Sequence, residues 1–233
     1  YKERETEKEK KREKDVPKKK KASVQKRLKA AYNAYSHDKV LLHWLQKHNS
    51  SSLDDSLHGR STDVIQNFQR RFSASCAGYC VATYVLGVGD RHNDNIMLKK
   101  TGELFHIDFG HFLGNFKYKL GVKRDAKLVF TPAMVQVLGG EGSPQYREFL
   151  IEACKAYQVL RKHALLLITL FKMMAGCGIP EIEHVSDVSY LRDRLMLEST
   201  DEEAEQKLRS VFQKCLRSRI TRVNDAVHLY VHL

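Results

Sequence analysis

This 233-residue sequence lacks three features that would indicate a membrane or secreted protein. The longest apolar run, Ala164 to Leu170, is less than half the roughly 18 residues of a membrane-spanning helix. The N-terminus has no apolar segment of the kind that secretory signals contain. The five cysteines follow no framework spacing, so we expect reduced thiols. Together these absences predict an intracellular, soluble chain.

The positive charge of the chain gives little support to nucleic-acid binding. The formal net charge is +12, but residues 1–31 hold 14 Lys and Arg against 6 Asp and Glu, so this stretch alone carries +8. The remainder carries only +4 and has no basic and aromatic face. We therefore expect no nucleic-acid partner.

The sequence divides into a charged tail and a body. Residues 1–31 are mostly Lys/Glu low complexity and are predicted to be a disordered basic tail or an insertion. The block Lys18–Lys21 has two interpretations, a solubilising linker or a membrane-surface or nuclear-targeting patch. Residues 32–233 are long enough for one large domain, and a chain that is 42% hydrophobic can bury a core.

The body is predicted to be mainly α-helical, with one small β-hairpin. Apolar periodicity or capping residues indicate helices over about 23–48, 61–87, 144–174, 185–197 and 200–217, and a further helix that opens at Thr131-Pro132. Two short strands, Ile96–Lys99 and Glu103–Ile107, flank a Lys-Thr-Gly turn. We expect the run Leu165–Ile168 to form the buried axis of a C-terminal helical bundle.

The chemistry is concentrated in a polar loop before the hairpin and in the Asp-Phe-Gly after it. Phosphoryl transfer needs a carboxylate and an amide oxygen on Mg²⁺, a group that acts on the attacking hydroxyl, and cations that oppose the developing charge. Asp108 and Asn95 suit the two metal-ligand roles, because the hairpin holds them near one another. Asp90, Arg91 and His92 suit the remaining roles.

The segments Ser75–His92 and Phe105–Lys117 resemble the catalytic subunits of phosphatidylinositol 3-kinases, in particular class I members. The resemblance runs from about His37 to Leu216. It implies the C-terminal lobe of a protein-kinase-like fold, in which a helical bundle and a small hairpin carry the catalytic and metal-binding loops. The parts that it implies are a catalytic loop at 89–96, a metal motif at 108–110, an activation loop at 111–131 and C-terminal helices at 132–233.

The resemblance also implies roles for individual residues. Asp90 and His92 would be the acid/base pair, assisted by Arg91, and His111 would be a second catalytic histidine near the γ-phosphate. Asn95 and Asp108 would bind Mg²⁺. The nucleotide, ATP, would contact Ile107 and Asp108.

The activation loop carries two basic clusters, Lys117 with Lys119 and Lys123 with Arg124. Such a loop can hold the phosphates of an inositol ring, which by resemblance favours phosphatidylinositol 4,5-bisphosphate. The alternative is an ordinary solvated loop. After Arg124 the sequence departs from the Arg-Glu-Arg-Val-Pro-Phe of the family, and Asp225 stands where the family has a membrane-contacting Trp.

The sequence has no Gly-rich phosphate loop and no strand-borne Lys for the nucleotide. We therefore expect a fragment that lacks the N-terminal lobe and is inactive alone. Regulatory-subunit and small-GTPase contacts would lie in the missing upstream domains. The resemblance further implies a cytoplasmic protein that is recruited peripherally to a phosphoinositide-bearing plasma membrane. The alternatives are a related protein kinase and a truncated, non-catalytic lobe that acts as an interaction module.

Overall fold

The computed structural model describes residues 38–49, 58–114, 118–119, 122–123 and 128–217. All of its helices and strands belong to one unit, Asp38–Thr221. The predicted tail at 1–31, the cations Lys117 and Arg124, and Asp225 lie outside the described residues. No helix among the residues described is long and apolar enough to cross a membrane.

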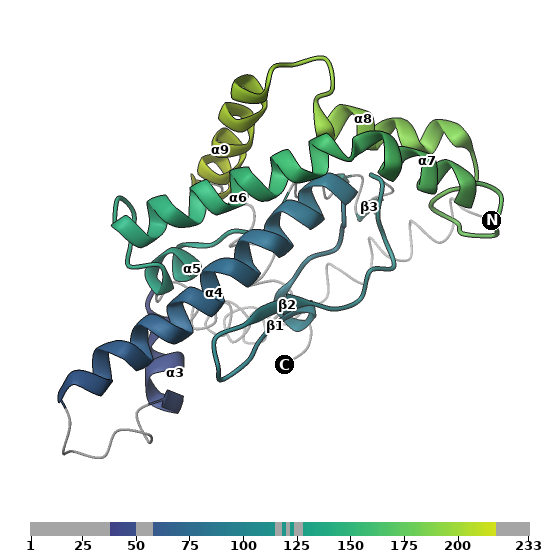
Figure 1. Cartoon of the computed structure of the whole chain (residues 1–233). Helices are drawn as coiled ribbons and strands as arrows, with labels where there is room; N and C mark the ends of the chain where they lie inside the picture. Colours follow the sequence, from purple (N-terminus) through teal and green to yellow (C-terminus); the bar gives the residue numbers. More distant parts are fainter. Residues whose placement is uncertain (1–37, 50–57, 115–117, 120–121, 124–127, 218–233) are drawn as a thin grey trace, which may run out of the picture. The chain divides into compact units, whose positions relative to one another are not determined.

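The long helix α4 (His58–Leu86) is the centre of the fold, and α6 (Pro144–Lys162) lies along it (Figure 1). Phe72, Cys76, Cys80 and Tyr84 recur every fourth residue on α4 and are all buried. This spacing places them on one face of the helix, as the sequence predicts. A shorter helix, α3 (Val40–Asn49), contributes the fully buried Leu45 to the same core.

The predicted hairpin is present and rests on α4. Strand β1 (Ile96–Leu98) pairs antiparallel with β2 (Leu104–His106), with Ile96 opposite His106. The amide of Leu104 donates to Ser75 Oγ of α4 at 2.9 Å. Gly102 has φ +108, and a Cβ there would collide with the Phe68 backbone of α4, so only glycine fits this turn. The hairpin therefore has a fixed position on the central helix.

Local capping signals set the start of the later helices. Thr131 caps α5 (Pro132–Val137) and Ser143 caps α6 by accepting backbone N–H bonds, and in both helices Pro occupies the first turn. The predicted capping box at Thr200 and Glu203 is formed at the start of α9 (Asp201–Arg217), with both reciprocal bonds present.

Aromatic packing joins α6 and α9 to the segment before α5. The rings of Phe130 and Phe149 stack at 5.0 Å, and Phe212 meets both edge-on at 5.1 and 5.4 Å. All three rings are almost completely buried. Such aromatic pairs add about 0.5–1.5 kcal/mol each beyond their area burial. This cluster fixes the segment that leads into α5 against α6 and α9.

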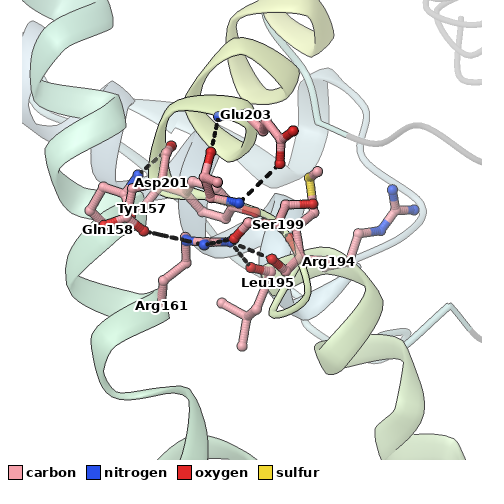
Figure 2. A network of polar contacts seen from close by, with 10 residues as sticks. Tyr157, Gln158, Arg161, Arg194, Leu195, Ser199, Asp201 and Glu203 are labelled. Atoms are coloured by element: carbon pink, nitrogen blue, oxygen red, sulfur yellow. Dashed lines mark hydrogen bonds and ion pairs between the residues drawn. The ribbon is translucent and has the colours of Figure 1, made fainter.

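Arg161 of α6 holds the turn between α8 (Ser189–Leu195) and α9 (Figure 2). Its guanidinium, 9% exposed, donates to the carbonyls of Leu195, Met196 and Ser199 and pairs with Asp201 at 3.2 Å. These bonds serve carbonyls where the chain leaves α8 at the left-handed residue Met196, whose own carbonyl also accepts the Ser199 amide at 3.0 Å.

The structure corrects four sequence-based expectations. The helix predicted for 144–174 is two helices, since the chain leaves helical geometry at His163 before α7 (Ala164–Met174). Residues 185–197 form a 3₁₀ turn, η3 (Val185–Val188), and then α8. A second hairpin, β3 (Tyr118–Lys119) with β4 (Val122–Lys123), lies in the predicted activation loop. The run Leu165–Ile168 is not a buried axis, because Leu165 and Leu166 are 79% and 57% exposed.

Candidate active site

The polar loop follows directly from the end of α4 and is fastened to the segment after Asp-Phe-Gly. Gly87 (φ +59) ends the helix against the Tyr190 ring, which a Cβ at this position would overlap. The amide of Gly89 then donates to the His111 carbonyl at 2.8 Å, and the amide of Leu113 donates to the Leu86 carbonyl at 2.8 Å. These two bonds hold the polar loop beside the first residues of the predicted activation loop.

The side chain of Asn95 forms hydrogen bonds to several groups of the loop. Asn95 lies in the 3₁₀ turn η2 (Asn93–Asn95), and its side chain is 3% exposed. Its Oδ1 accepts the His92 amide at 2.9 Å, and its Nδ2 donates to the Asp90 carbonyl at 2.7 Å and lies 3.2 Å from His92 Nε2. The two backbone partners fix which end of the amide faces which group. Asn95 therefore sets the path of the loop from Asp90 to His92.

Arg91 connects the loop to the Asp-Phe-Gly segment. Its Nε donates to the Gly89 carbonyl at 2.9 Å, its Nη1 donates to the Ile107 carbonyl at 2.7 Å, and its Nη2 donates to the Asp108 carbonyl. Burial lowers the pKa of Arg91, and the nearby carboxylates of Asp108 and Asp90 oppose that shift. A guanidinium keeps its proton at any physiological pH, so these hydrogen bonds do not depend on pH.

Asp90 and Asp108 both adopt left-handed backbone conformations, with φ +52 and +58. This region costs a non-glycine residue about 1 kcal/mol or more, and such residues concentrate at functional sites. The Asp108 side chain is exposed, and its Oδ1 accepts the Gly110 amide at 3.3 Å. The strained backbone thus leaves a carboxylate at the surface, directly after β2.

The amide oxygen of Asn95 and the carboxylate of Asp108 are of the chemical type that binds Mg²⁺. The amide of Ile107 donates to the Asn95 carbonyl at 3.0 Å, so Asn95 and Asp108 lie at the same end of the β1–β2 ladder. Asn95 Oδ1 accepts one N–H bond, and an amide oxygen has a second lone pair. The described residues include no cluster of three His, Cys, Asp or Glu, but Mg²⁺ is usually held by one or two side chains, with phosphates and water.

Two N–H groups of the same loop face the ring nitrogens of His92. The Asp94 amide points at Nδ1 from 3.3 Å, and Asn95 Nδ2 faces Nε2 from 3.2 Å. A doubly protonated ring would present N–H groups to both of these donors, whereas a neutral ring has one nitrogen that accepts. At least one ring nitrogen of His92 is therefore used as a hydrogen-bond acceptor inside the loop.

The comparison with known proteins shows which family the chain belongs to. The family described as "Phosphatidylinositol 3- and 4-kinase" matches residues 3–184. The chain is 44% identical over 193 residues to "Phosphatidylinositol 3-kinase 1" of Dictyostelium discoideum, which covers 82% of this chain and 12% of that relative. It is 41% identical over 194 residues to the human "Phosphatidylinositol 4-phosphate 3-kinase C2 domain-containing subunit beta", over 82% of this chain and 11% of the relative.

The chain belongs to the phosphatidylinositol 3- and 4-kinase family. It spans about an eighth of the length of these relatives. The predicted fold class is confirmed, since the helical unit with its small hairpin has the architecture of the C-terminal lobe of this kinase domain. The expected catalytic and metal-binding residues Asp90, Arg91, His92, Asn95 and Asp108 lie in one connected network, but their roles stay predictions.

The other predicted site residues are less completely described. Ile107, the expected nucleotide contact, is 42% exposed beside Asp108. Lys119 and Lys123 lie on the paired strands β3 and β4, where Lys119 is opposite Val122 and Lys123 is opposite Tyr118. The basic clusters are therefore described only through their backbone. His111 lies where the activation loop begins, with its ring partly buried.

Sequence reasoning missed two residues at the site of this kinase lobe. His106 is 3% exposed, both of its ring nitrogens lack a hydrogen-bond partner among the described residues, and its ring lies 5.2 Å from that of Tyr79. Burial, with the charge of Arg91 adding to it, lowers the pKa of His106 to about 4. Glu181 lies 3.8 Å from His111. The alternation of the strand could have predicted that His106 faces inward. No local pattern predicts the position of Glu181.

Proposed function

We propose that this chain is the C-terminal catalytic lobe of a phosphatidylinositol 3-kinase, which transfers the γ-phosphate of ATP to the 3-hydroxyl of a phosphoinositide. The observation that carries the proposal is the network of Asn95 and Arg91. It joins the loop that bears Asp90 and His92 to the backbone of Asp108. A phosphotransferase needs these groups on one rigid frame, because its catalysis is mostly positioning and charge stabilisation.

Each residue has a defined task in this proposal. Asp108 and Asn95 hold Mg²⁺, which when bound neutralises charge on the nucleotide phosphates. His92 and Asp90 orient the lipid hydroxyl and accept its proton. His111 faces the transferred phosphate, and the exposed Ile107 contacts the nucleotide.

Removal of the Asp108 carboxylate tests the enzymatic part of the proposal. In the full-length protein, Asp108→Asn keeps the shape of the side chain but removes the metal-binding charge, and we expect at least a hundredfold loss of lipid phosphorylation. The matched control is Asp63→Asn, at an exposed position of α4. Full activity of Asp108→Asn would contradict the metal role. We also expect residues 1–233 alone to be inactive, so robust turnover by this fragment would contradict the two-lobe argument.

We infer a bisphosphorylated headgroup from the basic clusters Lys117/Lys119 and Lys123/Arg124. Each charge-assisted contact to a ring phosphate contributes about 1–3 kcal/mol. Replacement of Lys123 and Arg124 by Gln should therefore lower the use of phosphatidylinositol 4,5-bisphosphate at least tenfold relative to unphosphorylated phosphatidylinositol. Phosphatidylinositol 4-phosphate belongs in the same assay, because one human relative is named for it.

The control for this experiment replaces two exposed helical lysines, Lys155 and Lys207, by Gln. An equal loss on all three lipids would make the loop a general membrane contact. Phosphorylation of peptides in place of lipids would favour the related protein kinases. Absence of both activities in the wild-type full-length protein would favour an interaction module.

The wider setting follows from the same proposal. A kinase of membrane lipids acts at a membrane surface, so we propose a cytoplasmic protein that binds the plasma membrane peripherally. Regulatory-subunit and small-GTPase contacts would lie upstream of this lobe. Cell fractionation with and without a membrane-recruiting stimulus tests the location, and a protein that stays in the nucleus throughout would contradict it.

A further inference from the structure

Glu181 is a largely buried carboxylate in the connection between α7 and η3. Its side chain is only 14% exposed, and the next residue, Ile182, is completely buried. The Ile182 amide donates to the Ile179 carbonyl at 2.9 Å, and the Gly176 amide donates to the Ile182 carbonyl at 3.3 Å. The backbone that carries Glu181 is therefore fixed. A carboxylate this far from solvent is costly unless charged or polar partners compensate it.

The partner on the catalytic side is His111. Its Nδ1 lies 3.8 Å from Glu181 Oε1, and its side chain is 28% exposed. The backbone of His111 is held by the Gly89 amide, and the next residue, Phe112, meets the Phe171 ring of α7 edge-on at 6.4 Å. Both ends of the pair are thus fixed, although 70 residues separate them in the sequence.

A carboxylate next to one imidazole nitrogen determines what the other nitrogen can do. Nδ1 faces the carboxylate of Glu181, which can accept an N–H from it, and Nε2 lies at the opposite edge of the ring. The separation of 3.8 Å is longer than a hydrogen bond, and such contacts in catalytic sites tighten when substrate binds. The contact thus places a carboxylate behind the His111 ring, where it can orient the imidazole.

We propose that Glu181 is a positioning residue that holds the His111 ring in one orientation, with Nδ1 toward Glu181 and Nε2 available to the transferred phosphoryl group. This role rests on the proposed function, because it gives Glu181 an effect on catalysis only through His111. Glu181 acts on turnover and leaves nucleotide binding unchanged, because its contact is with the histidine. It comes from a loop after α7, outside both the catalytic loop and the Asp-Phe-Gly segment.

The test is a double-mutant cycle on kcat and KM for ATP in the full-length kinase. Glu181→Gln keeps the size of the side chain and removes its charge, and should lower kcat roughly tenfold with KM for ATP unchanged within twofold. In a His111→Ala background the same change should cost less than twofold. Glu181→Asp should restore part of the loss. The control Glu183→Gln, at an exposed position of the same loop, should match the wild-type enzyme.

Three outcomes would overturn the proposal. Full kcat for Glu181→Gln would show that the carboxylate does not orient a catalytic group. A loss of the same size with and without His111 would mean that Glu181 acts only through the fold. Full turnover by His111→Ala would remove the histidine through which Glu181 is meant to act. All three leave the proposed lipid kinase activity standing, whereas a wild-type enzyme with no lipid turnover would overturn both proposals.

Discussion

Asn95 should stabilise the catalytic loop even when no metal is bound. The family resemblance makes it a ligand of Mg²⁺, but in the structure its amide already bonds the backbone at Asp90 and His92. If Asn95 only bound metal, its replacement would leave the metal-free loop unchanged. The two roles therefore predict different results in the presence of EDTA.

The contacts of Asn95 give the magnitude. Asn95→Ala leaves the His92 amide and the Asp90 carbonyl without their partners, in a position where the Asn95 side chain is 3% exposed. Each unpaired group of this kind costs about 1–3 kcal/mol, so we expect local opening of the loop to become easier by about 3 kcal/mol. That corresponds to about a hundredfold faster amide exchange, since 1.4 kcal/mol is a factor of ten.

Hydrogen exchange with mass spectrometry measures this directly on a peptide that spans residues 89–95, with EDTA present. The exposed helical residue Asn67 provides a matched control, Asn67→Ala, which should exchange at the wild-type rate. Asn95→Asp sharpens the test, because an aspartate can still bind metal but cannot donate to the Asp90 carbonyl. Loop exchange within twofold of the wild-type rate for Asn95→Ala would refute the structural role.

Three further predictions concern the stability of the lobe. The folded pKa of His106, about 4, lies below its ordinary 6.5, so its contribution to stability is complete above pH 6.5 and is lost as the pH falls toward 4. This loss of stability between pH 6.5 and pH 4 amounts to up to about 3 kcal/mol. His106→Phe should abolish it, as measured by thermal unfolding over that pH range. Arg161→Met should cost about 3 kcal/mol in urea unfolding because it removes the donor that serves the Leu195 and Ser199 carbonyls, whereas Arg192→Met, at an exposed ion pair, should cost less than about 1 kcal/mol. Gly87→Ala should lower the melting temperature far more than Gly178→Ala, since both have positive φ but only the first Cβ would collide with a ring.

Features coded by neighbouring residues could be predicted from the sequence. The hairpin follows from alternation around a Lys-Thr-Gly turn, in which Gly102 adopts a φ of +108. The starts of α5, α6 and α9 follow from Thr131, Ser143 and Thr200, each of which caps its own helix. In these cases the contact lies within a few residues of the group that makes it, so the pattern and the structure agree.

The errors arise where the partner is distant in the sequence. The composition of the run Leu165–Ile168 predicts burial, yet within it only Ile168 is buried. The helix break at His163 has neither Gly nor Pro, so the sequence does not indicate it. Arg161 and Glu181 are charged residues in otherwise ordinary surroundings, and their partners lie 34 to 70 residues away. The local hydrophobic periodicity of the sequence does not predict such contacts.

Arg91 illustrates how the structure changes the interpretation of a motif. An arginine in a catalytic loop suggests a cation that opposes the charge of the transferred phosphate. In this lobe its Nε, Nη1 and Nη2 each donate to a backbone carbonyl, two of them in the Asp-Phe-Gly strand end. Its charge also helps to keep His106 neutral. Because Arg91 holds Asp108 through its carbonyl, the Asp108 carboxylate stays available for a metal ion. The arginine thus fixes the backbone of the proposed metal site, and its direct catalytic role stays a prediction.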